Sequence, residues 1–265
     1  MGVPFDHMAT SYDSVFTNSA IGQLQRNHVW KYIENVIPQL KGFDMLELNC
    51  GTGEDAVLFS DRGFNIIATD ISEEMLKVTQ QKVQQYSMQH RISSQYLDLE
   101  SFNESSFNKK FDLIFSNFGG LNCINPQSLQ ILLKKLPLAL NKGGRFIAVI
   151  MPKNCLWESA YFLAKFSFGK AFRRWTNNEV LTDLQGVSSY TWYYSPRQII
   201  NWSNAHFEPV QHKPIGFALP PSYLEPFFKR RSSWLRQLDR MENKLNALPV
   251  LSRFSDHYLI DLRLK

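Results

Sequence analysis

Short apolar runs alternate with longer amphipathic stretches along the first 150 residues of the chain. This pattern predicts β-strands buried on both faces, with helices between them. The expected strands are 45–48, 65–69, 92–97, 111–115 and 144–151. Helices are expected from about Glu54, over 73–88, and just before a turn at 141–144. Strands joined by helices run in one direction, so an α/β fold with a parallel sheet is predicted.

The rest of the chain adds elements around this core, within a single domain of residues 1–265. Residues 1–37 are expected to form an N-terminal flap and a helix over 19–36, and residues 38–152 the core. Residues 153–205 form an insert, with a helix over 156–174, a strand over 186–195 and a helix over 196–202. Residues 206–265 supply a strand over 207–218, a basic helix that ends at about Leu245, and a last strand over 257–264.

The transition from the first strand to its helix is the most informative stretch. Cys50-Gly51-Thr52-Gly53 separates the strand from the helix, as in a nucleotide-binding βαβ unit. Glycine there lets the backbone approach a ligand, and the helix start presents free N–H groups. Asp70 ends the second strand, 17 residues after Gly53. An acid at that place can accept two hydrogen bonds from ribose hydroxyls.

Charge separates two kinds of nucleotide cofactor. Glu54 and Asp55 open the helix on which a dinucleotide would set its pyrophosphate. Like charges about 4 Å apart cost roughly 4 kcal/mol at an effective dielectric near 20. Glu47, inside the first strand, is suited to an ammonium group. A cationic cofactor is favoured, and an NAD(P)-dependent oxidoreductase stays the alternative.

Residues 40–150, and by architecture the rest, resemble the class I S-adenosylmethionine-dependent methyltransferases. The stretch LPLALNKGGRFIAVIM is similar to this family's helix, turn and fifth strand. The resemblance implies a doubly wound, seven-stranded, mostly parallel sheet whose last strand is antiparallel, with an insert between strands five and six. It also implies S-adenosyl-L-methionine as cofactor and S-adenosyl-L-homocysteine as product.

The family's cofactor contacts carry over by position. Glu47 corresponds to the acid that holds the amino-acid end, Asp70 to the ribose-binding acid, and Asp98 to an acid that accepts from the adenine amine. Asp98 capping the following turn is the alternative. Asn49 stands where many members have their first glycine. Further cofactor contacts are expected from Asn49, Gly51, Gly53, Ile71, Met75, Leu99, Asn117 and Phe118.

The N-terminal segment resembles the flap of small-molecule methyltransferases, in which Tyr12 would face the cofactor's methionine part. The alternative is an N-terminal helix that only covers the sheet. Methyl transfer would be an in-line displacement, so the protein mainly aligns the reactants and excludes water. Candidates for a general base are His257, His7 and Tyr12, each of which can instead be a surface or packing residue. No metal ion is expected.

The acceptor is expected to be a small molecule with an apolar or aromatic body. The insert is rich in aromatic residues that line a pocket or pack in the core: Trp157, Tyr161, Phe162, Trp192, Tyr193 and Tyr194. Nucleic acid is disfavoured as a substrate, because Phe118-Gly119 follows Asn117 where adenine methylators have Pro-Pro-Tyr. The basic helix over 222–245 is either a solvated face or a contact to a membrane surface or acidic carrier.

Composition adds few constraints. A hydrophobic content of 44% and a charged content of 20% are those of a globular protein, and a net charge of +5 demands no acidic partner. Three cysteines without metal or disulfide spacing favour a reduced cytoplasm. Pro-Ser-Tyr-Leu-Glu-Pro and Asp-His-Tyr-Leu look like features of a bacterial subgroup. A non-catalytic cofactor-binding protein of the same fold is a third alternative, and the oligomeric state stays open.

Overall fold

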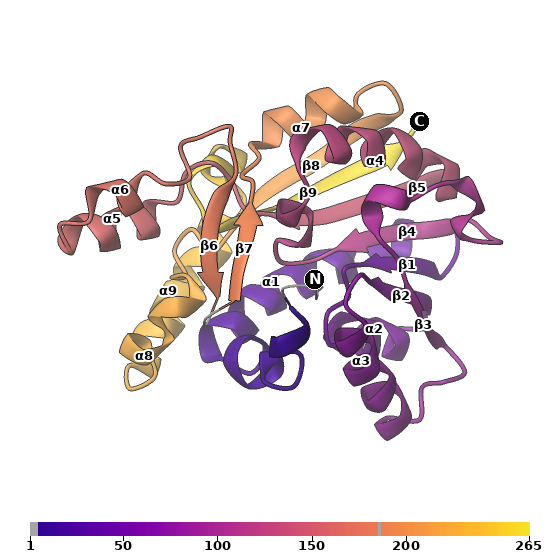
Figure 1. Ribbon diagram of the computed structural model, residues 1–265, viewed down its shortest axis with the longest axis horizontal. Coiled ribbons are helices and arrows are strands. Elements are labelled where there is room, and N and C mark those ends of the chain that lie inside the picture. The colour runs from indigo at the N-terminus through magenta and orange to yellow at the C-terminus, as the bar shows by residue number, and fades with distance from the viewer. Residues whose placement is uncertain (1–4, 185–186) are drawn as a thin grey trace.

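The computed structural model describes residues 5–184 and 187–265. A seven-stranded sheet with the strand order β3-β2-β1-β4-β5-β9-β8 forms its centre, and a two-stranded hairpin lies beside it (Figure 1). The strands of the sheet are β1 (Asp44–Leu48), β2 (Asn65–Asp70), β3 (Ile92–Tyr96), β4 (Phe111–Ser116), β5 (Leu140–Ile150), β8 (Phe207–Ile215) and β9 (His257–Leu264). The hairpin consists of β6 (Val180–Leu184) and β7 (Val187–Thr191).

Strand directions confirm the predicted doubly wound sheet. Strands β1 to β5 pair in parallel, and β9 runs antiparallel between β5 and β8. The register pairs Ile150, at the end of β5, with Tyr258, near the start of β9. The first residues of β9 therefore lie at the same edge of the sheet as the carboxyl ends of β1, β2 and β4. Ligands of open α/β sheets bind outside this edge.

Helices cover both faces of the sheet (Figure 1). They are α1 (Ala20–Val36), α2 (Glu54–Asp61), α3 (Glu73–Gln85), α4 (Pro126–Ala139), α5 (Leu156–Ala164), α6 (Phe168–Ala171), α7 (Pro196–Ser203), α8 (Glu225–Phe228) and α9 (Ser232–Leu245). Side chains of α4 and α7 pack in one hydrophobic cluster with the sheet, and side chains of α1, α2 and α3 pack in the other. The two clusters give the parallel strands the apolar cover that they need on both sides.

Several predicted boundaries are wrong, mostly outside the core. The expected helix over 156–174 is divided into α5 and α6, because Phe166 between them adopts a left-handed backbone with φ 54°. The helix expected to end at Leu245 is divided into α8 and α9. Strand β6 was not predicted, and its partner β7 is shorter than the expected 186–195, whose Gly186 lies outside the described residues. The fifth strand begins at Leu140, with a register shift opposite Phe111.

The N-terminal segment folds as two short helical turns, η1 (Asp6–Met8) and η2 (Asp13–Thr17). Its two acids tie it to the core. A carboxylate oxygen of Asp6 accepts a hydrogen bond from Ser72 Oγ at 2.6 Å, and Asp13 accepts one from Thr52 Oγ1 at 2.6 Å. The segment therefore lies across the turn after β1 and the start of α3. None of the helices in the described ranges has the length and apolar character required to cross a bilayer.

Candidate functional site

The turn after β1 adopts a left-handed backbone without the family's first glycine. Asn49 has φ 48°, a conformation that asparagine tolerates better than most side chains do. Its amide joins two strand ends, because Ser116 Oγ donates to Oδ1 at 2.7 Å and Nδ2 donates to the Asn117 carbonyl at 3.2 Å. A Cβ on Gly120 would lie 2.1 Å from the Asn49 amide. The missing side chain of Gly120 therefore leaves space for the Asn49 amide. The turn keeps its left-handed backbone although asparagine replaces the expected glycine.

Asp70 lies at the carboxyl end of β2 with its oxygens already organised. Gly51 N–H donates to Oδ2 and Ser72 N–H donates to Oδ1, both at 2.9 Å. Burial raises the pKa of this carboxyl, and the N–H groups of Ser72 and Gly51 oppose the rise. A carboxylate oxygen can accept more than one hydrogen bond, so each still has room for a hydroxyl. A Cβ placed on Gly51 would meet nothing within 4 Å, so the space beside this turn is open.

Glu47 is a buried acid inside β1, two residues before Asn49 of the turn. It is 1% exposed, and its Oε2 atom finds no hydrogen-bond partner among the described residues. Burial raises its pKa well above the usual value, and the negative charge of Asp55 raises it further. An unpaired buried carboxylate is costly. An ammonium group placed against Glu47 would remove that cost, so this residue fits the amino group of an amino-acid ligand.

Arg26 of α1 is a site residue that the sequence analysis missed. Its Nη1 atom lies 2.6 Å from Asp55 Oδ2, and its guanidinium lies 5.2 Å from the centre of the Phe118 ring. Asp55 also accepts from Trp30 Nε1 at 2.5 Å and from Asn117 Nδ2 at 2.9 Å. The sequence indicates only that Arg26 and Trp30, four residues apart, lie on the same side of a helix. It does not indicate that this side contacts Asp55.

The paired acids of α2 alter one sequence argument. Glu54 lies 2.9 Å from Lys82 Nζ, and Asp55 is bound by Arg26. Both acids that were expected to repel a pyrophosphate thus have cationic partners. The charge argument against a dinucleotide is therefore weaker than the sequence alone suggested.

The N-terminal segment closes the site. A cavity of about 30 Å³ remains beneath it. Its walls are formed by Tyr12, Arg26, Asn49, Cys50, Gly51, Thr52, Glu54, Asp55, Asn117 and Phe118. A space of that size has room for water but not for a nucleoside. Burial raises the pKa of Tyr12, whose ring packs 5.1 Å from Phe16. Asp13 holds the segment down through Thr52 and through Lys82 Nζ at 2.8 Å.

His257, at the start of β9, lies beside this cavity. Its ring stands edge to face with Phe118, 5.3 Å between centres. Its Nδ1 atom is 3.2 Å from Asp256 Oδ2, although the pair is not aligned as a hydrogen bond. Burial alone would raise the pKa of Asp256, but His257 and Arg174 lower it below its usual range. Asp256 therefore stays ionised next to the imidazole.

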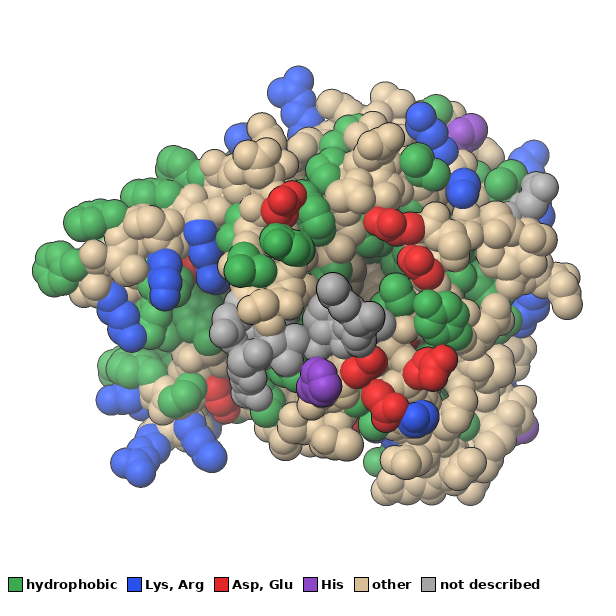
Figure 2. Space-filling model, viewed as in Figure 1, with side chains coloured by type: hydrophobic (Ala, Val, Ile, Leu, Met, Phe, Trp, Pro, Cys, Tyr) green, Lys and Arg blue, Asp and Glu red, His purple; other side chains and the backbone are tan. Residues whose placement is uncertain are grey.

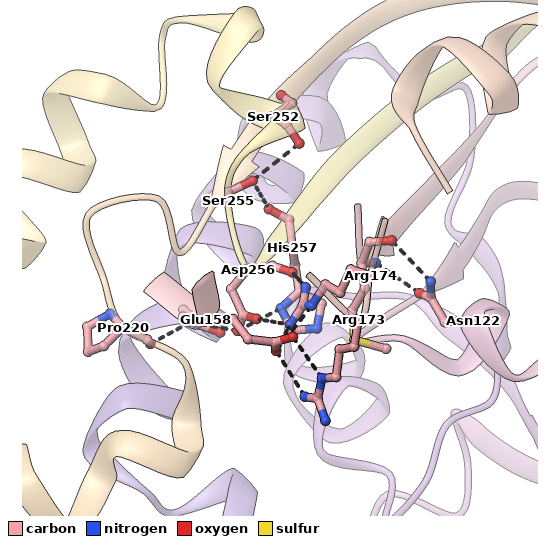
Figure 3. Close-up of polar contacts among 11 residues, drawn as sticks. Asn122, Glu158, Arg173, Arg174, Pro220, Ser252, Ser255, Asp256 and His257 are labelled. Carbon is pink, nitrogen blue, oxygen red and sulfur yellow. Dashed lines mark hydrogen bonds and ion pairs between the residues drawn. The ribbon is translucent and has the colours of Figure 1, made fainter. Parts of the chain in front are cut away.

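A chain of ion pairs runs from Asp256 into the insert (Figure 3). Arg174 Nη2 lies 3.0 Å from Asp256 Oδ1 and 2.9 Å from Glu158 Oε2. Arg173 donates to the other oxygen of Glu158 at 2.8 Å. Glu158 of α5 is 2% exposed. The insert thus reaches the start of β9 through charged groups, a link that the sequence analysis did not find.

The remaining predicted site residues are spread around the cavity without lining it. Asp98 accepts from Glu100 N at 2.9 Å and so caps the turn η4 (Leu99–Ser101), while Leu99 packs against the core. Ile71 is 39% exposed, and Met75 is buried. His7 is exposed on η1, and the structure does not bring it to the cavity. The adenine-side roles of these residues stay predictions.

The aromatic residues of the insert do not contribute to the walls of the cavity. Tyr194 is buried in the core and donates to the Ile124 carbonyl. Tyr193 is buried with Arg174 5.1 Å from its ring centre, and Trp157 donates to the Phe217 carbonyl at 3.0 Å. The alternative of plain packing therefore fits Tyr194 and Trp157. In the described part of the chain, no group of His, Cys, Asp and Glu residues could hold a metal ion.

Comparison with known proteins finds similarity to methyltransferases over part of the chain. Residues 45–144 match the family model described as a methyltransferase domain. YqeM of Bacillus subtilis (strain 168) is 38% identical over 80 residues, 30% of this chain and 29% of that protein. The demethylmenaquinone methyltransferase of Paenarthrobacter aurescens (strain TC1) is 27% identical over 160 residues, 59% of this chain and 58% of that protein.

Solved structures show the same fold at low sequence identity. An S-adenosylmethionine-dependent methyltransferase from Clostridium acetobutylicum ATCC 824 superposes with a TM-score of 0.58 at 18% identity, covering 98% of both chains. By sequence, the chain spans between 29% and 58% of the length of the first curated relatives that it matches.

Proposed function

We propose that this chain, whose core belongs to the class I S-adenosylmethionine-dependent methyltransferases, transfers the methyl group of S-adenosyl-L-methionine to a small acceptor. The observation that carries the proposal is the buried Glu47 carboxylate with an oxygen that no described group satisfies. It lies on the strand that leads into the Gly51 turn, against which Asp70 is fixed. A cationic amino acid joined to a nucleoside has the groups that these acids require.

The residues present fit each part of that cofactor. Asp70 would accept from the two ribose hydroxyls, and Glu47 would bind the ammonium group. Arg26 lies in the cavity wall, and its guanidinium would bind the carboxylate of the cofactor's amino-acid end while still bound to Asp55. A guanidinium is well suited to this, because it presents five donors in one plane. Asp98 has one carboxylate oxygen engaged in its turn and the other available for the adenine amine.

Cofactor entry requires the N-terminal segment to move. The cavity beneath the segment holds about 30 Å³, far less than any nucleoside needs. Two sets of polar contacts anchor the segment: Asp6 binds Ser72, and Asp13 binds Thr52 and Lys82. When the segment lifts, these groups form hydrogen bonds with water instead. Because water replaces the lost partners, the net free energy lost with each hydrogen bond is about 0.5–1.5 kcal/mol. The segment thus acts as a flap that opens for exchange and closes for chemistry.

The bound cofactor supplies an electrophilic methyl group on sulfur, which the acceptor displaces in line. The protein keeps water away beneath the flap and aligns the acceptor. His257 takes the proton that an O–H or N–H acceptor loses, through the ring nitrogen that does not face Asp256. Asp256 orients the ring and stabilises the imidazolium that forms, and Arg174 holds Asp256 in place. Tyr12, in the flap, forms part of the cavity wall.

The acceptor would be a small molecule with an apolar or aromatic body. The Phe118 ring beside His257 offers an apolar wall next to the base. The partial match to a demethylmenaquinone methyltransferase agrees with an aromatic acceptor. Trp192 is only partly buried, so the insert would contribute to acceptor binding through this residue.

Two alternatives have distinct signatures. An NAD(P)-dependent oxidoreductase would bind NADH, and a non-catalytic protein of this fold would bind S-adenosyl-L-homocysteine without transferring methyl groups. Isothermal calorimetry on the purified chain should show micromolar binding of S-adenosyl-L-homocysteine and no comparable binding of NADH. The opposite preference would end the proposal. Incubation with methyl-labelled cofactor and candidate acceptors then separates an enzyme from a binding protein.

A further inference from the structure

Helices α5, α6, α8 and α9 lie at one end of the molecule (Figure 1, left), and they and the turns beside them carry several exposed aromatic side chains. We call this surface the aromatic end; it consists of Phe166, Phe168, Phe172, Trp175, Phe227 and Trp234. Phe166 is 83% exposed, Phe168 62% and Trp175 61%. The two pairs of helices are in contact, because the Trp157 ring of α5 lies 6.2 Å from that of Phe228 in α8, and the Tyr161 ring lies 5.5 Å from that of Tyr223, just before α8.

Basic side chains are interleaved with these rings. The segments 159–178 and 226–238 contain no aspartate or glutamate. Figure 2 shows the basic and hydrophobic side chains side by side at this end. Arg231 lies 4.0 Å from the centre of the Phe227 ring, and Lys165 lies 4.5 Å from that of Tyr161. The exposed cations of the aromatic end are Lys165, Lys170, Lys229, Arg230, Arg231 and Arg236.

Interactions within the fold do not account for this surface. The same helices direct other side chains inward, where they are satisfied: Arg174 binds Glu158 and Asp256, and Leu235 packs with Phe228 and Ile21. Trp234, beside the buried Leu235, is 54% exposed. Phe166 occupies the turn between α5 and α6, so its ring projects from the end of the molecule. Large exposed apolar patches rimmed by polar groups mark interaction sites.

We propose that the aromatic end docks on the surface of an anionic lipid bilayer. Aromatic rings bind at the boundary between headgroups and acyl chains, and adjacent lysines and arginines are attracted to acidic lipids. The two signals together give stable yet reversible anchoring. A second copy of this chain would bring like charges together. An acidic protein would satisfy the cations but offers no apolar layer for the protruding rings.

Sedimentation of the full chain with lipid vesicles tests the proposal without any methyl transfer, so its outcome is independent of the proposed function. The two preparations are phosphatidylcholine alone, and phosphatidylcholine with an equal amount of phosphatidylglycerol. We expect the chain to sediment with the second preparation and to remain in solution with the first. Added salt should release it, because screening weakens the attraction of the cations to the acidic lipids.

Paired variants locate the contact. Lys229→Gln with Arg230→Gln should weaken vesicle binding about 25-fold, since each removed charge contributes about fivefold, or about 1 kcal/mol. Phe166→Ser with Phe168→Ser should weaken it by about tenfold or more, because both rings lose their apolar surroundings. Tyr86→Ser with Lys142→Gln removes an aromatic and a cation exposed elsewhere, and should bind vesicles as the wild type does. An unchanged thermal midpoint would show that each variant is folded.

Three outcomes would overturn the proposal. The wild type could fail to bind either vesicle preparation. The control variant, with Tyr86 and Lys142 replaced, could also lose as much binding as the variant with Phe166 and Phe168 replaced. Alternatively, the chain could self-associate or bind an acidic protein through Phe166 and Phe168 while ignoring vesicles. Light scattering at increasing protein concentration, for the wild type and the aromatic pair, detects self-association.

Discussion

Replacing Asp70 by alanine tests how the turn after β1 recognises a ribose. Each carboxylate oxygen of Asp70 accepts one backbone N–H, from Gly51 and Ser72, and has one direction left for a hydroxyl. Hydrogen bonds to a charged acceptor contribute about 1.5–3 kcal/mol, which corresponds to roughly 10- to 150-fold in affinity. Calorimetric titration with S-adenosyl-L-homocysteine should therefore show a dissociation constant raised by that factor.

Two further variants separate recognition from folding. Asp70→Asn keeps an oxygen for one of the two N–H groups, so it should fold better than Asp70→Ala and still bind weakly. Asp44→Asn changes an acid at the opposite end of β1, where it pairs with Lys109 at 2.6 Å, and should leave the affinity unchanged. If folded Asp70→Ala binds S-adenosyl-L-homocysteine as tightly as the wild type, the ribose assignment is wrong.

Four other predictions concern the flap, the ion-pair chain and the base. Hydrogen exchange over residues 5–18 should slow when S-adenosyl-L-homocysteine is bound, whereas equal exchange in both states would mean a fixed arm. Glu158→Gln should lower the free energy of unfolding by about 3–5 kcal/mol, because it removes the buried acid that pairs with both Arg173 and Arg174. Glu208→Gln breaks an exposed ion pair with Arg263 and should lower the free energy of unfolding by only about 0–1 kcal/mol. Equal losses for Glu158→Gln and Glu208→Gln in a urea titration would contradict this difference. Burial alone would raise the pKa of Glu158, but Arg174 and Arg173 lower it below 4.5. The ionised Glu158 therefore stabilises the fold above pH 4.5, and this contribution is lost as the pH falls through its lowered pKa. Acid should thus reduce the free energy of unfolding of the wild type more steeply than that of Glu158→Gln. For an O–H or N–H acceptor, His257→Asn should lower the rate of methyl transfer by about 10²- to 10⁴-fold, and Asp256→Asn should lower it by less. Both variants should keep the affinity for S-adenosyl-L-homocysteine. Unchanged rates would show that His257 is not the general base.

The sequence predicted the parts of this molecule that depend on local pattern. Apolar runs identified the strands, with Glu47 inside the first and Asp70 at the end of the second, because the pattern of a buried strand is set by neighbouring residues. The site residues that were missed depend on contacts between distant segments. Arg26 meets Asp55 across 29 residues, and Arg174 meets Asp256 across 82 residues. No spacing rule connects such pairs.

The insert shows the same limit in its backbone. Apolar content over 156–174 indicated one helix, yet the chain turns at Phe166 and returns Arg174 to the buried Glu158. That contact joins residues 16 positions apart, so the helix preference of neighbouring residues does not predict it. Strand β6 was missed for a related reason: among the described residues it pairs with β7 alone, and it does not join the main sheet.

The position of β9 has a consequence for how the protein is made. This strand is inserted between β5 and β8, and it is synthesised after both. On a ribosome, the pairing edge of β5 is therefore complete on the order of ten seconds before its partner exists. An unpaired apolar strand edge is prone to join other chains during that interval. Premature termination before His257 would leave the edge open permanently, so truncated products should aggregate and be degraded rather than accumulate as smaller folded proteins.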